Sequence, residues 1–213
     1  MVINFLKNIT IRKFWFLKLL LNKKQTFLYQ TGWIKSFQIK RPVNIKGEEM
    51  PWLVMPLLYF LEEKDLSNLS LFEYGAGNST IYFKKRLKEV VSVEHHALWY
   101  EEIRAKLKLS TDEIIYAKLG SDYVNAVSKP NKKFDIILVD GRKRVACCEA
   151  SLDKITEHGV LVLDDSERSN YKEVFPICKQ HGYKHLTFWG TNLGGVNHKS
   201  TTIFYKDGNV LGI

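Results

Sequence analysis

Apolar and polar residues alternate along residues 50–213 in segments that predict strands and helices in turn. Short runs rich in Val, Ile, Leu and Phe predict strands at residues 70–74, 90–94, 113–117, 134–140, 160–164, 183–188 and 201–205. The segments before and between them have helical spacing of apolar residues, which predicts helices at residues 52–62, 79–87, 97–107, 123–127, 145–157 and 170–181. Such alternation is typical of a mostly parallel sheet covered by helices.

The last two predicted strands differ from the others, because no helix pattern separates them. Their connection, residues 190–200, is rich in Gly and Asn instead. Two strands joined without a crossover helix are expected to pair antiparallel. The pattern therefore predicts an α/β fold: a Rossmann-like seven-stranded sheet, mostly parallel with an antiparallel last strand, with helices on both faces.

Composition and charge divide the chain into two parts. Of 213 residues, 45% are hydrophobic and 13% aromatic, which is enough for one domain with a real core and excludes a disordered chain, a collagen-like repeat and a disulfide scaffold. The net charge of +9 is concentrated in residues 1–46, which contain ten Lys and Arg and no Asp or Glu. We therefore divide the chain into a basic N-terminal extension, residues 1–46, and a nearly neutral domain, residues 47–213.

Two roles stay open for the N-terminal extension. A helix over residues 3–24 would place its cations in three stripes about 120° apart, whereas a membrane-surface helix gathers them on one face. Packing on the domain or on a partner subunit, as in a homo-oligomer, and peripheral contact with an anionic membrane are therefore both retained. No stretch reaches the roughly 18 to 20 apolar residues of a membrane span, and no small-residue cleavage site follows the apolar run at residues 14–21.

The cysteines bear on the compartment. Cys147 and Cys148 are adjacent, which is a poor geometry for a disulfide between them, and Cys178 is the third. Unpaired, packed thiols are typical of a reducing compartment. We therefore expect a cytoplasmic protein, with membrane association open.

A glycine turn follows the first predicted strand and opens a helix. Gly75 and Gly77 permit unusual backbone angles and let a ligand lie against the main chain, at the sheet edge where ligands bind. Thr80 stands where the dinucleotide motif would have its third glycine. Glu94 closes the next strand about 20 residues later, where a carboxylate can accept hydrogen bonds from both ribose hydroxyls. Together they favour an adenosyl ligand, with a ligand-free tight turn and a helix-capping carboxylate as the alternatives.

These residues, with Glu73 on the first strand and Asp140 closing the fourth, resemble the S-adenosylmethionine (SAM) motifs of class I methyltransferases. A wider set, over about residues 31–206, resembles a group of bacterial methyltransferases. That set comprises Gly32-Trp33-x-x-Ser36, Pro51-Trp52, the segment 73–80, Ser92-Val93-Glu94-His95, Val139-Asp140-Gly141-Arg142 and the segment 163–168. The resemblance implies SAM as the cofactor and, more loosely, an acceptor from sugar or cell-surface glycan pathways.

The resemblance also implies roles for single residues. The segment 75–80 would contact the methionine and ribose portions of SAM, Glu94 the ribose, and Glu73 the methionine ammonium. Ser121, Asp122 and Tyr123 would lie beside the adenine, and His95 would be a packing or adenine-edge residue. The implied cofactor-binding set is Glu73, Tyr74, Gly75, Ala76, Gly77, Asn78, Ser79, Thr80, Glu94, His95, Ser121, Asp122, Tyr123 and Asp140.

The catalytic candidates are Asp140, Asp164 and Arg142. Methyl transfer to a hydroxyl needs an aligned acceptor and a group that takes its proton, and both carboxylates close neighbouring strands. Asp140 could instead hold the methionine ammonium or cap a turn. The guanidinium of Arg142 suits a carboxylate or phosphate on the acceptor. Alternatively, Arg142 and Arg168 pair with Asp164, Asp165 or Glu167 and hold the loops in shape.

A divalent cation is the alternative arrangement at this edge. Asp140, Asp164 and Asp165 occupy positions like those that hold the cation in catechol-type methyltransferases, where it would acidify a hydroxyl. The third position holds Asp165 instead of an amide, and the acceptor-binding lid of that family is not recognisable. We therefore expect no metal. Among the tryptophans, Trp189 is expected to line a pocket, and Trp33, Trp52 and Trp99 to lie in the core or a lid.

The leading hypothesis is a SAM-dependent methyltransferase that methylates an oxygen of a small-molecule or glycan-linked acceptor. A nucleic-acid methyltransferase is the first rival. The strand that ends in Asp140 continues Gly-Arg-Lys-Arg, however, where enzymes that methylate exocyclic base nitrogens have an Asn/Asp-Pro-Pro-aromatic turn. A non-catalytic interaction protein with this fold predicts a damaged site, whereas the motifs are intact. An oxidoreductase is disfavoured by the incomplete glycine pattern.

Overall fold

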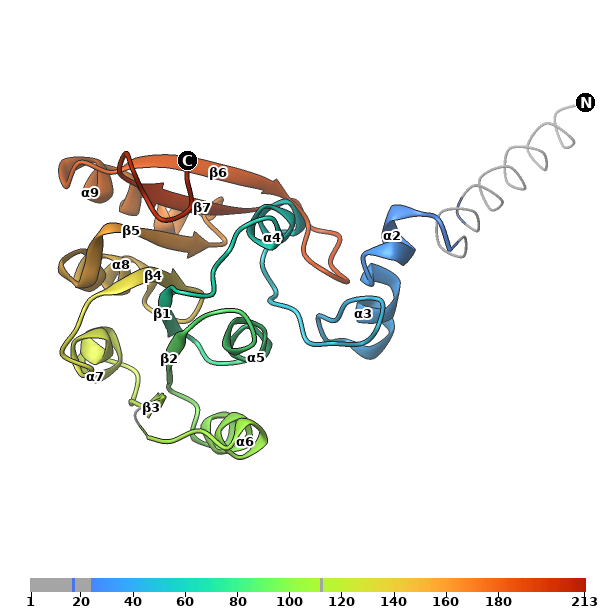
Figure 1. Cartoon of the computed structure of the whole chain (residues 1–213), viewed down its shortest axis with the longest axis horizontal. Coiled ribbons are helices and arrows are strands. Elements are labelled where there is room, and N and C mark those ends of the chain that lie inside the picture. The colour runs from blue at the N-terminus through green and yellow to red at the C-terminus, as the bar shows by residue number, and fades with distance from the viewer. Residues whose placement is uncertain (1–16, 18–23, 112) are drawn as a thin grey trace, which may run out of the picture.

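Seven strands form one sheet in a computed structural model that describes Leu17, residues 24–111 and residues 113–213 (Figure 1). The strands are β1 (Ser70–Tyr74), β2 (Glu89–Glu94), β3 (Ile114–Tyr116), β4 (Phe134–Val139), β5 (Ile155–Asp164), β6 (Lys184–Gly190) and β7 (Lys199–Tyr205). Their order is β3-β2-β1-β4-β5-β7-β6, in which β1 to β5 are parallel and β7 is antiparallel to both of its neighbours. The predicted sheet, with its antiparallel last strand, is confirmed.

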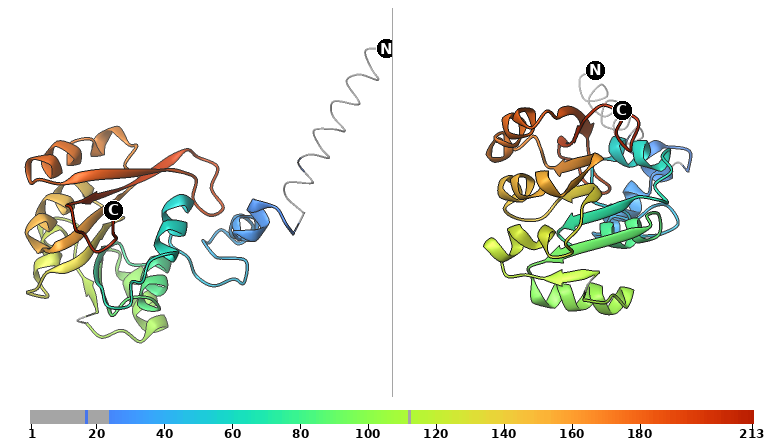
Figure 2. Two further views of the ribbon diagram at one scale, coloured as in Figure 1. Left: turned by 45° about the horizontal axis from the view of Figure 1, so that its top comes forward. Right: turned by 60° about the vertical axis from the view of Figure 1, so that its left-hand side comes forward.

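Helices cover both faces of the sheet, as the right-hand view of Figure 2 shows. One layer contains α4 (Met55–Glu62), α5 (Asn78–Lys84) and α6 (Ala97–Leu107), and the other contains α7 (Ser121–Val124), α8 (Arg144–Ser151) and α9 (Val174–Gln180). Side chains alternate across the strands, so Leu71 packs in the first layer and Phe72 in the second. The doubly wound arrangement leaves the carboxyl ends of the strands free to build a site.

The start of β5 differs from the sequence prediction. The helix expected over residues 145–157 ends at Ser151, and after a 3-10 turn the chain enters β5 at Ile155. Ile155 pairs with Phe134, and the register then shifts before Ile136 pairs with Val160. A Cβ at Gly159 would lie 2.9 Å from the carbonyl oxygen of Asp135, so a glycine is needed where the two strands come close. Pairing with β4 determines where β5 begins, and the spacing of apolar residues alone did not predict it.

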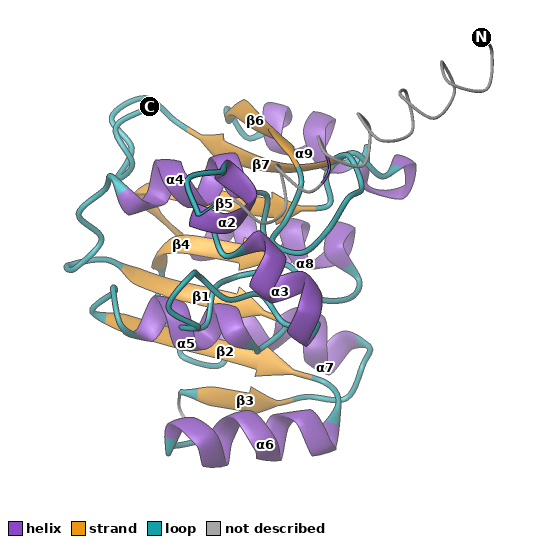
Figure 3. Cartoon of the chain, turned by 90° about the vertical axis from the view of Figure 1, so that its right-hand side faces the viewer, coloured by secondary structure: helices purple, strands orange, loops and turns teal. Residues whose placement is uncertain are grey.

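The described part of the N-terminal extension packs on the rest of the chain. It forms α2 (Phe27–Gln30) and α3 (Trp33–Ile39), which lie on the α4–α5 side of the sheet (Figure 3). Trp33 is only 9% exposed, belongs to the same apolar cluster as Leu193, and donates from Nε1 to the carbonyl of Gly195 at 2.8 Å. The helix proposed for residues 3–24 lies almost wholly outside the described residues.

The three cysteines are packed and unpaired, as the sequence predicted. Cys147, Cys148 and Cys178 are buried and free, and burial raises the pKa of Cys147 to about 12, which keeps this thiol protonated. Of the helices that the structure describes, none has the length and apolar character needed to cross a membrane.

Candidate active site

A cleft of about 630 Å³ opens where β1, β2, β4 and β5 end. Its wall combines the glycine loop after β1, the start of α6, the loop between β4 and α8, the loop after β5, and a piece of the N-terminal extension. The lining residues are Lys40, Arg41, Pro42, Trp52, Gly75, Ala76, Gly77, Asn78, Ser79, Glu94, His95, Trp99, Asp140, Gly141, Arg142, Arg144, Asp165 and Arg168. Segments far apart in the sequence therefore meet at this one edge of the sheet.

The glycine loop turns its main chain towards the cleft. Gly75 has a positive φ of 96°, and a Cβ there would lie 3.1 Å from the Cα of Gly141 on the neighbouring loop. Gly77 is extended, donates from its N–H to Oγ1 of Thr80 at 2.9 Å, and would have no atom within 4 Å of an added Cβ. The space beside Gly77 is thus open, while the space beside Gly75 is filled by protein.

Glu73 stabilises the glycine loop from the interior of the domain. Its side chain is fully buried, and Oε2 accepts hydrogen bonds from the hydroxyls of Thr80 at 2.5 Å and Ser92 at 2.8 Å. Burial raises the pKa of Glu73 to about 7, although these hydroxyl donors act in the opposite direction. Glu73 does not line the cleft, so its contact with a methionine ammonium stays a prediction.

One carboxylate oxygen of Glu94 is bound by main-chain N–H groups, and the residue lines the cleft. Its Oε1 accepts from the backbone N–H groups of His95 and His96, both at 2.8 Å. Oε2 has no hydrogen bond to any residue in the described ranges. The carboxylate therefore caps the chain entering α6 and also presents a free acceptor to a ligand. Both interpretations of Glu94 from the sequence are compatible with this geometry.

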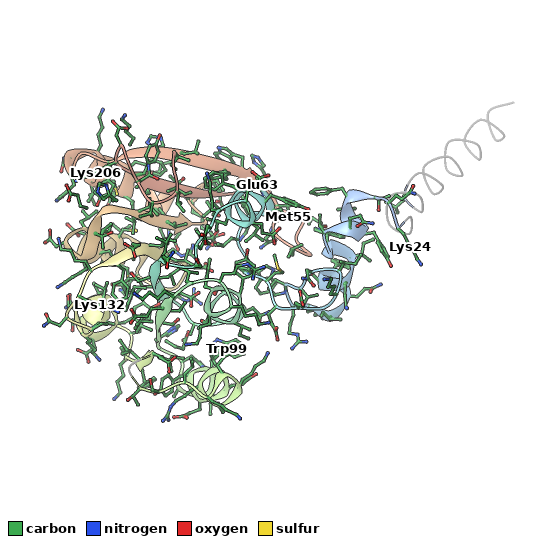
Figure 4. All side chains as sticks on the ribbon, in the orientation of Figure 1. Lys24, Met55, Glu63, Trp99, Lys132 and Lys206 are labelled. Atoms are coloured by element: carbon green, nitrogen blue, oxygen red, sulfur yellow. The ribbon has the colours of Figure 1, made fainter. Side chains whose placement is uncertain are left out.

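The side of the cleft next to Glu94 is aromatic. The His95 ring meets Tyr123 edge to face at 5.6 Å. Trp99, labelled in Figure 4, donates from its indole N–H to the carbonyl of Ala76 at 2.6 Å and lines the cleft. Ser121 and Asp122 are exposed at the start of α7 and are not part of the lining. An indole and an imidazole thus flank the space where an adenosyl group would lie.

The other predicted cofactor residues fall into two groups. Gly75, Ala76, Gly77, Asn78, Ser79, Glu94, His95 and Asp140 line the cleft, together with the catalytic candidate Arg142. Tyr74, Thr80 and Tyr123 are buried behind it. Tyr74 donates from its hydroxyl to the carbonyl of Val124 at 2.6 Å, and a Cβ at Gly141 would collide with the hydroxyl of Tyr123. Tyr74 and Tyr123 thus shape the loops from the second helix layer, and Thr80 does so from α5 in the first.

Three carboxylates at the ends of β4 and β5 share one guanidinium. Nη2 of Arg144 lies 3.1 Å from Oδ1 of Asp140 and 3.2 Å from Oδ2 of Asp165, and Nη1 lies 3.5 Å from Oδ2 of Asp164. Arg144 is nearly buried and also donates from Nε to the carbonyl of Gly141 at 3.0 Å. The arginine that pairs with these acids is therefore Arg144 and not Arg142. The pairing proposed for Arg168 is found, at 2.6 Å from Asp165.

The two predicted catalytic carboxylates differ in access. Asp140 lines the cleft with about a fifth of its side chain exposed, and burial together with the charge of Asp164 raises its pKa well above the usual value. Asp164 accepts from Oγ1 of Thr201 at 2.7 Å and lies behind Arg144, outside the cleft lining. Burial and then the charge of Asp165 raise its pKa as well. Of the two, Asp140 is placed to touch a bound acceptor.

Among the residues that the structure describes, no group of three or more His, Cys, Asp or Glu is arranged to hold a metal ion. The three Asp side chains proposed for that alternative are joined instead by Arg144. Arg144 therefore supplies the positive charge between these carboxylates in the described structure.

Sequence reasoning missed part of the cleft. Trp52 and Trp99 line it, whereas Trp189 stacks on His198 at 4.8 Å and does not, so the expectation for Trp189 is wrong for this cleft. Lys40 and Arg41 were noted only as charges of the N-terminal extension. Asp140 and Arg144 are four residues apart on the loop that leads from β4 into α8, and this short separation was the available signal for their pairing. No spacing rule brings residue 40 next to residue 77.

Arg144→Met tests the shared guanidinium. We expect the free energy of unfolding at pH 7 to fall by about 3–5 kcal/mol, because buried carboxylates lose their common cation. Urea unfolding followed by circular dichroism measures this. The matched control is Arg142→Met on the same loop, where the exposed side chain has no ion pair with a described residue and a change within about 0.5 kcal/mol is expected. If both variants lose the same free energy of unfolding, Arg144 is not the shared partner of the three aspartates.

Glu73→Gln tests the buried carboxyl through pH. Because the pKa is about 7 in the folded chain and near 4.5 when unfolded, the folded state holds a proton between these values that the unfolded state has released. Folding stability should therefore fall as pH rises from about 5 to 8, by about 3 kcal/mol, and Glu73→Gln should lack this step. Unfolding curves at pH 5 and pH 8 check it, with Glu102→Gln on the exposed side of α6 as control. Parallel pH profiles for wild type and Glu73→Gln would refute it.

No protein-family model and no curated protein matches the sequence. Solved structures do match. The O-methyltransferase TomG from Streptomyces achromogenes, solved with SAM, is 15% identical with a TM-score of 0.54, over 91% of this chain and 95% of TomG. Precorrin-6y C5,15-methyltransferase from Geobacter metallireducens is 14% identical with a TM-score of 0.52, over 71% of this chain and 87% of that one. A Streptococcus mutans structure in complex with S-adenosylhomocysteine (SAH) is 12% identical with a TM-score of 0.50, over 74% of this chain and 100% of that one. The chain therefore has the Rossmann-like fold of these methyltransferases.

Proposed function

We propose that the chain is a SAM-dependent methyltransferase that methylates an oxygen of a small-molecule or glycan-linked acceptor. One observation carries this proposal. The open main chain at Gly77 and the free Oε2 of Glu94 lie on the wall of one cleft at the strand ends. Solved structures with this fold were obtained with SAM and with SAH, which supports the same cofactor here.

The residues of the cleft fit SAM. Glu94 would accept from the ribose hydroxyls with Oε2, and the main chain around Gly77 would contact the methionine portion where a side chain would intrude. A sulfonium and an ammonium are cationic, so Asp140 and the indole face of Trp99 are suitable neighbours. When bound, SAM supplies an electrophilic methyl group.

Asp140 is the residue placed to take the proton of a hydroxyl acceptor. Its raised pKa makes it a stronger base than an ordinary aspartate, and Arg144 holds its carboxylate from the protein side. As the acceptor oxygen bonds to the methyl carbon, the carbon–sulfur bond breaks with its electrons going to sulfur, and the hydroxyl proton passes to Asp140. The protein positions the acceptor and holds this charge, which are the main contributions expected for methyl transfer.

The acceptor class is inferred from the motifs of the sequence and from one solved structure. The resemblance of motifs such as Pro51-Trp52 to a group of bacterial methyltransferases associated with glycan pathways favours a sugar-derived compound. The name of TomG, an O-methyltransferase, favours oxygen as the methylated atom. Trp52, half exposed on the cleft wall, offers an aromatic face for such a compound.

Gly77→Val tests the cofactor loop. The protein should remain as stable as wild type, because Gly77 is extended and an added Cβ meets no atom within 4 Å. The side chain would fill the space that the ligand needs, so titration calorimetry should detect no SAH binding. The comparison is Gly75→Ala, which should lower the melting temperature because of its positive φ and its contact with Gly141. Wild-type affinity in a folded Gly77→Val protein would rule out this loop as the cofactor site.

Glu94→Gln tests the ribose contact. The amide oxygen can still accept from the main-chain N–H groups of His95 and His96, while the amide nitrogen cannot accept from a hydroxyl. We expect SAH affinity to fall about tenfold or more, in line with the ~1.5–3 kcal/mol of a hydrogen bond to a charged group, at nearly unchanged melting temperature. Glu102→Gln is the control. If both variants bind SAH equally well, Glu94 does not hold the ribose.

A further inference from the structure

The cleft has an excess of positive charge. Five cationic side chains line it, Lys40, Arg41, Arg142, Arg144 and Arg168, against three carboxylates, Glu94, Asp140 and Asp165. Bound SAM would add to the excess, since its sulfonium and ammonium outweigh its single carboxylate. The cleft therefore favours a negatively charged second ligand.

The cations are not equivalent, because only some are neutralised by the protein. Arg144 and Arg168 pair with aspartates. Lys40, Arg41 and Arg142 have no ion pair with any residue of the described ranges, and all three are exposed. These three side chains are the positive charges that remain available to a ligand.

Lys40 and Arg41 are held at the cleft by a built connection. The hydroxyl of buried Ser36 donates to the carbonyl of Val43 and accepts from its N–H, both at 2.9 Å, which closes the loop that carries the two cations. Asn78 of the glycine loop donates to the carbonyl of Pro42 at 3.2 Å. The segment is thus tied to the loop proposed to hold SAM.

Arg142 reaches the same cleft from the loop after β4. In the sequence it stands between Asp140, the proposed base, and Arg144, the buried partner of the aspartates, and all three line the cleft. Gly141 must lack a side chain because the hydroxyl of Tyr123 and the carbonyl of Tyr74 approach it, which fixes the course of this loop. Residues about a hundred positions apart therefore present unpaired cations to one space.

We propose that Lys40, Arg41 and Arg142 bind an oxyanion of the acceptor, a phosphate or a carboxylate, so the acceptor is an anionic small molecule. This inference rests on the proposed function, since the acceptor must lie in the cleft that holds SAM. The described part of the N-terminal extension then has a binding role, which is to supply two of the three contacts. A guanidinium presents parallel donors that match both oxyanions.

The test uses the full chain and two probes, inorganic pyrophosphate for phosphate and malonate for carboxylate. Each is titrated by calorimetry at constant ionic strength, with and without saturating SAH. We expect at least one probe to bind, and the tighter one identifies the anion. Lys40→Gln, Arg41→Gln and Arg142→Gln should each weaken its binding by about tenfold, as loss of a charge-assisted hydrogen bond requires.

Matched controls remove the same charge outside the cleft. Lys46→Gln in the N-terminal extension and Lys143→Gln beside Arg142 should change the affinity less than twofold, since neither lines the cleft. Arg41→Lys keeps the charge but loses the parallel donors, so it should weaken binding less than Arg41→Gln does. Melting temperatures of all variants show whether a loss reflects unfolding.

The outcomes separate this inference from the proposed function. If SAH does not bind, the proposed function fails, while the titrations without SAH still test the anion site. If SAH binds but neither probe does, or if control and cleft variants weaken binding equally, the anion site is refuted. A 12-nucleotide RNA that binds more tightly than either probe, and that Lys46→Gln weakens as much as Arg41→Gln, would indicate a nucleic-acid surface and overturn the proposal.

Discussion

The guanidinium of Arg144, shared among three aspartates, is the interaction on which the organisation of the strand ends depends. Parallel strands β4 and β5 end side by side and carry Asp140, Asp164 and Asp165 to one place. Carboxylates so close together repel one another in a poorly solvated environment. Arg144, from the first turn of α8, lies against all three and also donates to the carbonyl of Gly141, while Arg168 and Lys199 pair in addition with Asp165. The loop that carries Arg142 is thereby fixed relative to both strands.

Close approach of main chains is the second constraint. Gly75 and Gly141 lie on adjacent loops so near each other that a Cβ on either would meet the other loop. The buried Glu73, bonded to Thr80 and Ser92, secures the glycine loop from below. One face of this loop is therefore rigidly packed, while the face at Gly77 stays open. A ligand-binding loop needs both properties, because an open surface that is not supported would lose its shape.

The sequence predicted local features well and tertiary neighbours only in part. The seven strands and the antiparallel last pair follow from apolar runs and from whether a helix connects them. Glu94 was found because its distance from the glycine turn is set by a single β-α-β unit. Arg144 was overlooked in favour of Arg142, since which of two near neighbours faces the acids depends on where α8 begins. Lys40 could not be placed at the cleft, because its position depends on how the N-terminal extension packs on the loops. The position of Trp52 depends on a contact far along the chain, the hydrogen bond from its Nε1 to the carbonyl of Leu193 at 3.0 Å.

Under the proposed function, the positions of the charges in the cleft would link the binding of cofactor and acceptor. Glu94 lies at the end assigned to the adenosyl group, whereas Lys40, Arg41 and Arg142 carry charges that no described residue neutralises. An anionic acceptor bound by these cations would also be attracted by the positive sulfonium of SAM. Transfer of the methyl group would remove the sulfonium charge, and the hydroxyl proton taken by Asp140 would remove one negative charge, so the net charge of the cleft would stay the same during this step. Release of that proton from Asp140 to solvent would restore the negative charge, and this later step would weaken the attraction for the anionic product and favour its release.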